Sequence, residues 1–150
     1  MTEQLARHDP RLRAWRSFLL AHAQVVRELE RELQDEQQLA LTDYDVLVQL
    51  AAAAGEHRLR MSELADRLLL SRSGATRLVD RMVAGGLVER ASCESDRRGQ
   101  WASLTDEGLR RLRAASPTHL RGVKRHFLDR LSAQDLADLE RMLDPIVEVG

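Results

Sequence analysis

The feature that most constrains this chain is the order of elements that residues 61–104 predict. A short helix begins near Ser62, a tight turn follows, and Ser71 caps a second amphipathic helix that two glycines close. Two runs with strand character, 87–90 and 100–104, are separated by a polar loop and indicate a hairpin. A short helix, a turn, a helix and a hairpin in this order form a helix-turn-helix with a wing.

Longer amphipathic helices are predicted on the N-terminal side of this segment. Asp9-Pro10 predicts a capped helix start, and apolar residues then recur at helical spacing from Trp15 to Leu33. Residues 42–45, Thr-Asp-Tyr-Asp, have the pattern of a capping box. They predict a second helix, which ends at Gly55.

The C-terminal side is also predicted to be helical. Thr105 caps a long helix with two acidic residues in its first turn. We expect this helix to be interrupted near Ser116-Pro117 and to resume through Leu131. Residues 132–135, Ser-Ala-Gln-Asp, form a second capping-box pattern and open a last helix before Pro145.

Together these elements predict a mainly α fold with a small β-hairpin wing. We expect one domain over residues 1–150, with a winged helix-turn-helix lobe at 42–105 and dimerisation helices at 9–35 and 106–150. No apolar run is long enough to span a bilayer, and the first residues lack the pattern of a signal peptide. We therefore expect a cytoplasmic protein with no membrane partner.

The terminal helices predict a homodimer. Trp15, His22 and Leu29 recur every seven residues, and Leu120 and Phe127 repeat the same spacing near the C-terminus. A lone chain of 150 residues would struggle to cover both apolar stripes, whereas a second copy would cover them. An ordinary intrachain core is the alternative.

Composition argues against several classes of function. The single cysteine, Cys93, excludes an internal disulfide and any multi-cysteine metal site. His119 and His126 are seven residues apart, too far for one metal ion. No nucleophile and base stand in a recognisable catalytic pattern, and no glycine-rich phosphate loop is present. We expect neither an enzyme, nor a cofactor, nor a metal site.

The helix that Ser71 caps has the chemistry of a recognition helix for duplex DNA. Its polar face carries short hydrogen-bonding side chains and arginines close to the N-terminus, where orphan N–H groups also attract phosphate. These residues are Ser71, Arg72, Ser73, Thr76 and Arg77. A solvated helix face is the alternative interpretation. The net charge of the chain favours neither interpretation, because the sequence has 23 basic and 24 acidic residues.

The hairpin tip adds a second DNA-binding feature. An arginine at such a tip can enter the narrow, electronegative minor groove, and a carboxylate two residues away can hold it extended. Asp96, Arg97 and Arg98 fill this tip.

The ordered motifs resemble the MarR family of winged-helix regulators. That family has an Asp-x-Arg wing tip, a strand that ends in Leu-Thr and a glycine three residues later. Those motifs correspond to residues 96–98, 104–105 and Gly108 here. Leu41-Thr42 and the run from Ser71 to Arg81 extend the resemblance over most of the chain.

The resemblance implies roles for individual residues. Base and phosphate contacts fall to the five polar residues of the recognition helix. Arg98 becomes the minor-groove arginine, Asp96 its orienting carboxylate and Arg97 a phosphate contact. It also implies a double-stranded DNA operator with inverted half-sites, bound by a homodimer.

Members of this family are often released from DNA by small aromatic or phenolic acids. Trp15, Arg16, His22 and Tyr44 are candidate ligand contacts, because an aromatic wall with one cation suits an aromatic carboxylate. Asp45 and Arg90 fall where the urate-responsive branch has pocket residues, although this chain lacks the tryptophan-bearing N-terminal extension of that branch. Packing alone is the alternative for Trp15 and His22.

The leading hypothesis is a sequence-specific transcriptional repressor that binds DNA as a homodimer and responds to a ligand. The alternative is a winged-helix dimer that serves as a protein-interaction module. Such a module would have no need of Ser73, Thr76 and Arg77 on one helix face together with Arg98 at the wing tip.

Overall fold

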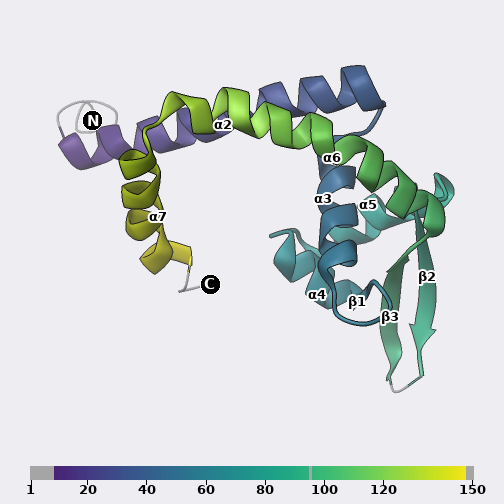
Figure 1. The fold of residues 1–150 in the computed structure, drawn as a ribbon. Helices are drawn as coiled ribbons and strands as arrows, with labels where there is room; N and C mark the ends of the chain where they lie inside the picture. The colour runs from purple at the N-terminus through teal and green to yellow at the C-terminus, as the bar shows by residue number, and fades with distance from the viewer. Residues whose placement is uncertain (1–8, 95, 148–150) are drawn as a thin grey trace. The chain divides into compact units, whose positions relative to one another are not determined.

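The structure is a computed structural model that describes residues 9–94 and 96–147, except for the side chains of Cys93 and of residues 96–98 (Figure 1). It is mainly helical with a small antiparallel sheet, so the predicted fold class is confirmed. The chain divides into two compact units. One contains the described residues up to Glu32 and from His119 onward, and the other spans Leu33–Thr118.

The second unit is the winged helix-turn-helix. Its helices are α3 (Leu41–Ala52), α4 (Met61–Arg67), α5 (Arg72–Ala84) and the first part of α6 (Asp106–His126), and its strands are β1 (Arg58–Arg60), β2 (Val88–Cys93) and β3 (Asp96–Leu104). The strands pair antiparallel in the order β1-β3-β2 (Figure 1). Apolar side chains from α3, α4, α5 and β2 close the core. They include Val46, Leu47, Leu64, Val79 and Val88.

The described elements of the first unit are all helical. It contains most of α2 (Pro10–Gln37), the end of α6, a 3₁₀ turn η1 (Leu128–Arg130) and α7 (Ala133–Val147). Asp9 caps α2, because its Oδ1 accepts the backbone N–H of Arg11 at 2.9 Å. Ser132 and Asp135 form the predicted capping box: Asp135 accepts the N–H of Ser132 at 3.0 Å, and the Ser132 hydroxyl accepts the N–H of Asp135 at 3.1 Å.

Two predicted helix starts are wrong. α3 begins at Leu41 with Ala40 at its N-cap, and α4 begins at Met61 with Arg60 at its N-cap, and neither N-cap supplies a side-chain hydrogen bond. Thr42 has another partner: its Oγ1 accepts from Arg81 of α5 at 3.5 Å, while Asp43 accepts from the same guanidinium. A tertiary contact therefore takes the Thr42 hydroxyl that the capping box would use.

The helix predicted to break at Ser116-Pro117 is continuous. α6 passes through Pro117 without interruption, although the proline ring removes one backbone donor. Thr118 is buried and accepts a hydrogen bond from Gln37 Nε2 at 3.0 Å, and Ala115 is fully buried on the same helix. These contacts hold both sides of the proline in helical geometry.

Helix ends and strand lengths also differ from the prediction. α6 ends at His126 and a 3₁₀ turn follows, so the helix does not reach Leu131, and α7 runs through Pro145 instead of ending before it. β2 and β3 extend into the stretch predicted as a loop, and β1 is an addition that the sequence pattern does not predict. The alternation in a three-residue strand such as β1 is too short to predict the strand by itself, because its hydrogen bonds depend on β3.

Candidate nucleic-acid interface

Helix α5 presents the predicted recognition face to solvent. Ser71, Arg72, Ser73 and Arg77 are exposed and Thr76 is half-buried. The opposite face of the helix is apolar and closed, since Ala75, Leu78, Val79 and Met82 are buried. Within the described part of the chain, neither Arg72 nor Arg77 has an ion-pair partner. Two guanidinium groups are therefore available to an external anion.

The two ends of α5 are set by local sequence. The Ser71 hydroxyl accepts the backbone N–H of Gly74 at 3.0 Å, so the predicted cap is confirmed. At the other end Gly86 takes a φ of +74°, and the N–H of Leu87 reaches the carbonyl of Met82 at 3.0 Å. The left-handed glycine turns the chain directly into β2.

Ion pairs tie α5 to its neighbours. Arg81 binds Asp43 of α3, and Asp80 binds Arg90 of β2. The first pair connects α5 to the core helix α3, and the second pair connects α5 to strand β2 of the wing. The buried apolar face of α5 determines which residues the helix shows to solvent, and the two ion pairs link the edges of that helix to its neighbours.

The wing is the hairpin formed by β2 and β3. Its register pairs Arg90 with Ala102 and Ala91 with Trp101, and an irregularity follows between Ser92 and Cys93. The backbone of residues 96–98 opens β3 at the tip of this hairpin (Figure 1). The side chains of Asp96, Arg97 and Arg98, like that of Cys93, lie outside the described part of the structure. Their roles stay predictions.

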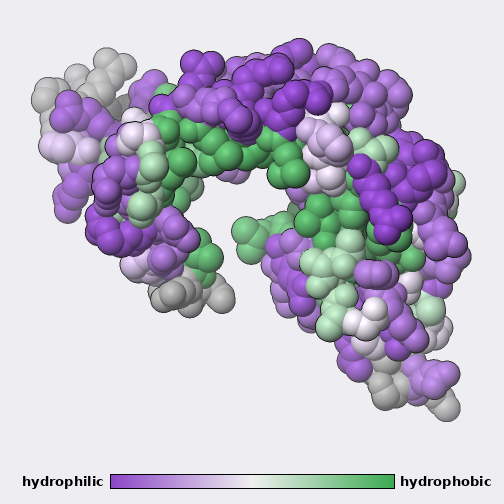
Figure 2. All heavy atoms as spheres, in the orientation of Figure 1, coloured by the Kyte–Doolittle hydropathy of each residue, from purple (hydrophilic) through white to green (hydrophobic). Residues whose placement is uncertain are grey.

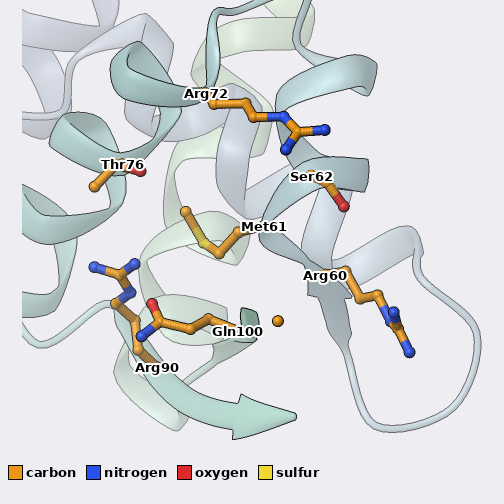
Figure 3. Close-up of a pocket in the computed structure, with 8 residues that line it drawn as sticks. Arg60, Met61, Ser62, Arg72, Thr76, Arg90 and Gln100 are labelled. Atoms are coloured by element: carbon orange, nitrogen blue, oxygen red, sulfur yellow. The ribbon is translucent and has the colours of Figure 1, made fainter. Parts of the chain in front are cut away.

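A pocket of about 460 Å³ lies between α5, the start of α4 and the wing (Figure 3). Eight residues line it: Arg60, Met61, Ser62, Arg72, Thr76, Arg90, Gly99 and Gln100. In Figure 3 the side chain of Arg90 extends upward from the wing toward Thr76, and Met61 lies centrally between the surrounding elements. Two residues of the predicted recognition face, Arg72 and Thr76, therefore belong to a concave surface that reaches the wing.

Trp101 adds an aromatic group beside this pocket. The guanidinium carbon of Arg58 lies 4.8 Å from the centroid of its ring, and that of Arg60 lies 5.5 Å away. Both arginines project from β1, which pairs with β3 so that Arg60 faces Trp101. Cation–π contacts of this kind hold long side chains in place while their N–H groups stay exposed.

The candidate ligand residues divide between the two units. Trp15, Arg16 and His22 are exposed on α2 in the first unit, where Trp15 stacks on Phe18 with 6.1 Å between ring centroids. Tyr44, Asp45 and Arg90 belong to the second unit.

The three ligand candidates of the second unit have different surroundings. Tyr44 is buried, with its hydroxyl 3.4 Å from the Ser116 hydroxyl, and Asp45 is exposed on the same helix. Arg90 pairs with Asp80 and lines the pocket beside α5. Tyr44 and Asp45 do not line that pocket, so the structure does not bring these three together there.

The first unit carries a broad apolar surface (Figure 2). A groove of about 600 Å³ is lined by α2, α7 and the segment between α6 and α7, with His22, Phe18, Phe127, Leu139 and Leu143 among its residues. None of the described residues of α7 is buried. Trp15, Leu20, Leu120 and Ile146 are all more than half exposed.

The sequence and the fold of this chain match those of known proteins. The family model described as MarR family matches residues 37–99. AbsC, a MarR family transcriptional regulator from Streptomyces coelicolor, is 41% identical, covers 90% of each chain and superposes with a TM-score of 0.84. The chain belongs to the MarR family.

Two further relatives of this MarR-family chain show how far the similarity extends. Sco3205 from Streptomyces coelicolor was solved in complex with DNA; it is 36% identical over 90% of this chain and 84% of its own, with a TM-score of 0.84. The transcriptional regulator PecS of Dickeya dadantii is 26% identical over 105 residues, which are 70% of this chain. The chain spans 63% of PecS, less than two thirds of that curated relative.

Sequence reasoning missed part of the candidate interface of this MarR-family protein. Arg58 and Arg60 are absent from the predicted contacts, because they lie in the short strand β1, whose place depends on its pairing with β3. Ser62, predicted only as a helix cap, is the second residue of α4 and lines the pocket. The signal that could have found the two arginines is the alternation of Arg58, Leu59 and Arg60, where the buried leucine between two exposed arginines has strand period.

No helix of the described residues is long and apolar enough to cross a membrane.

Proposed function

We propose that this MarR-family protein is a cytoplasmic transcriptional regulator that binds double-stranded DNA in a sequence-specific manner. The observation that carries the proposal is the solvent-facing side of α5, where Ser73, Thr76 and Arg77 stand opposite a fully buried apolar face. An α-helix of this width fits the major groove, and its arginines and hydroxyls match base-edge acceptors and phosphate oxygens.

Binding by a homodimer is the second part of the proposal. One winged helix makes few contacts, so useful affinity takes two half-sites about one helical turn apart. The exposed apolar side chains of α2 and α7 offer the surface on which a second copy would pack, and α7 by itself is too short to be stable in water. A two-fold dimer then predicts an operator with inverted half-sites.

The direction of regulation and its control complete the proposal. We place the protein among repressors that a small aromatic acid releases from DNA. Trp15, Arg16, His22, Tyr44, Asp45 and Arg90 remain the candidate contacts of that ligand. The matching assay adds substituted benzoates to the preformed complex with DNA and measures release.

Selection of DNA from a random pool tests the central claim. We expect enrichment of an inverted repeat by the wild-type protein. Arg77→Ala should weaken binding to that operator by about 1 to 3 kcal/mol and relax the preference at one position in each half-site, because the arginine contacts base edges. Arg98→Ala should instead reduce the preference for narrow A·T-rich flanks, and Asp96→Ala should do so to a smaller extent.

The same experiment can reject the proposal. If the pool yields no consensus, and both Arg77→Ala and Arg98→Ala bind duplex DNA as the wild type does, the α5 face and the wing are solvated surface. The protein-interaction module then replaces the regulator.

A further inference from the structure

The apolar groove of the first unit contains one titratable side chain. The groove lies between α2, α7 and the segment that joins α6 to α7, and its volume is about 600 Å³. Among the residues of the described structure that line it, only His22 and Ser17 are polar. His22 is exposed on α2, and no hydrogen bond or ion pair joins its ring to a described residue. The imidazole therefore stands in an apolar groove without a polar partner from the described part of the chain.

The elements around the groove place no carboxylate beside His22. The positions one helical turn before and after it on α2 are held by Phe18, Leu19, Val25 and Val26. The other elements contribute only apolar side chains: Phe127, Leu131, Leu139 and Leu143.

The charged groups closest along these elements are engaged elsewhere. Glu28 and Arg130 line a separate pocket next to the groove. On α7, Asp138 pairs with Arg141. None of these groups lines the groove in the described structure, so none is placed to stabilise a protonated His22.

A second copy of this chain is the occupant that the groove fits. The described part of α7 buries no residue, and its Met142 and Ile146 are 55% and 71% exposed. A helix of this length is not stable in water by itself, so its apolar face needs a protein surface. A two-fold partner brings the same apolar helices to the same groove, and each copy covers the other.

Covering the groove removes His22 from water. A protonated imidazole would lose its hydration there without gaining a counter-ion, which is unfavourable, whereas the neutral ring can be buried at a much smaller cost. Association of two chains is then coupled to the loss of one proton from each His22. The free chain binds protons more readily than the dimer, so association is complete at higher pH and weakens as the pH falls.

We propose that a second copy covers the α2–α7 groove only when His22 is neutral, so that the dimer, and operator binding with it, is lost in acid. The proposal rests on the homodimer of the proposed function and deepens it, because it adds a condition under which the protein leaves DNA. His22 acts here at the interface between copies and has no contact with DNA.

The dissociation constant of the dimer as a function of pH tests the proposal. Sedimentation equilibrium is run from about pH 7.5 to about pH 5.5, the interval over which exposed imidazoles change charge. Circular dichroism at each pH defines the range in which the chains stay folded, and only that range is compared. We expect the dissociation constant to rise on the order of 100-fold across the whole interval, because each of two histidines contributes about tenfold.

Three variants assign the effect to one residue. His22→Leu keeps the groove apolar and cannot titrate, so its dissociation constant should change by less than about threefold over the same interval. His22→Arg is charged throughout and should be at least as weak at pH 7.5 as the wild type is at the acid end. His57→Asn is the matched control: it removes an exposed histidine of the second unit at a φ of +52°, which asparagine tolerates, and should behave as the wild type does.

Operator binding supplies a second readout. At the acid end of the folded range, His22→Leu should still bind the inverted repeat at protein concentrations at which the wild type has dissociated from it. A duplex with a single half-site is the control, since wild type and His22→Leu should bind it equally at every pH.

The outcomes separate this inference from the proposed function. A wild-type dimer with the same dissociation constant at both ends of the interval, or a His22→Leu protein with the wild-type pH dependence, would overturn the proton linkage while the homodimer and the regulator stand. A wild type that is monomeric at pH 7.5 would overturn the homodimer and the linkage together. If the wild type dimerises but binds no duplex, the regulator fails, and sedimentation still decides whether His22 controls association.

Discussion

Leu69, like Gln38 and His57, is a described non-glycine residue with a positive φ. It directly follows Leu68, the C-cap of α4, with a φ of +54°, and it is 93% exposed. The N–H of Leu70 bonds to the carbonyl of Ala65, and that of Leu69 bonds to Asp66, which is the pattern that closes a helix through a left-handed residue. Glycine normally fills this place, because a Cβ disfavours the left-handed region.

Leu69→Gly should therefore stabilise the protein. The left-handed strain of about 1 to 2 kcal/mol is relieved, and part of the gain is offset by the greater freedom of glycine in the unfolded chain. We expect a net gain of about 0.5 to 1 kcal/mol in a urea unfolding curve. Leu70→Gly, one residue later, is the control and should destabilise; an equal effect of both changes would exclude backbone strain as the cause.

His119 confers acid sensitivity on the native state. Burial lowers the pKa of its imidazole below the ordinary value of 6.5. The unfolded chain then binds a proton more readily, so stability is complete above pH 6.5 and declines as the pH falls through the interval down to the native pKa. Urea midpoints from about pH 7.5 to about pH 5 should fall less steeply for His119→Gln than for the wild type. Identical slopes would mean that other groups titrate.

At the scale of elements, local patterns predict local structure well. Ser71, Thr105 and Ser132 are caps as predicted, since each needs only a backbone N–H three residues on. The predicted caps Thr42 and Ser62 are wrong, because the elements around them are placed by contacts with α5 and β3. Periodicity predicts the α5 face, whereas the part of the pocket that Arg60 contributes depends on β1 pairing across the chain.

The joint between the wing and α6 depends on one glycine. A Cβ on Gly108 would stand 2.2 Å from the carbonyl oxygen of Leu87 and 2.8 Å from Leu104 Cδ1. Thr105 secures the same joint by donating to the carbonyl of Gly86 at 2.7 Å. The first turn of α6 thus packs directly on the backbone where β2 begins.

Gly108→Ala should lower stability by about 1 to 3 kcal/mol, because the neighbouring backbone cannot yield as a side chain would. Chemical denaturation measures the change. Arg113→Ala, an exposed position on the same helix, should lie within about 0.5 kcal/mol of the wild type. A Gly108→Ala protein as stable as this control would show that the joint has room to adjust.

At the scale of the whole molecule, the two units differ in how fully their apolar side chains are buried. Leu33–Thr118 contains a core of fully buried aliphatic side chains, whereas the described part of α7 buries none. The helices around α7 keep large apolar side chains in water. A second copy that covers them would contribute much of the stability of the first unit.

Sedimentation or light scattering at micromolar concentration should show a dimer. Unfolding should also depend on protein concentration, with the melting temperature rising as concentration rises, because the folded first unit binds its copy and the unfolded chain does not. Met142→Lys, at an exposed apolar position of α7, should weaken association without altering the second unit. A wild-type monomer whose melting temperature is independent of concentration would contradict the proposed interface.

The exposed apolar side chains of α2 and α7 have a consequence for gene dosage. If only pairs of chains bind the operator, and pairing follows mass action, the amount of active regulator at low abundance rises with the square of the amount synthesised. Halving synthesis then removes about three quarters of the binding species rather than half. A cell that tunes expression of this protein therefore changes operator occupancy more steeply than the change in expression itself.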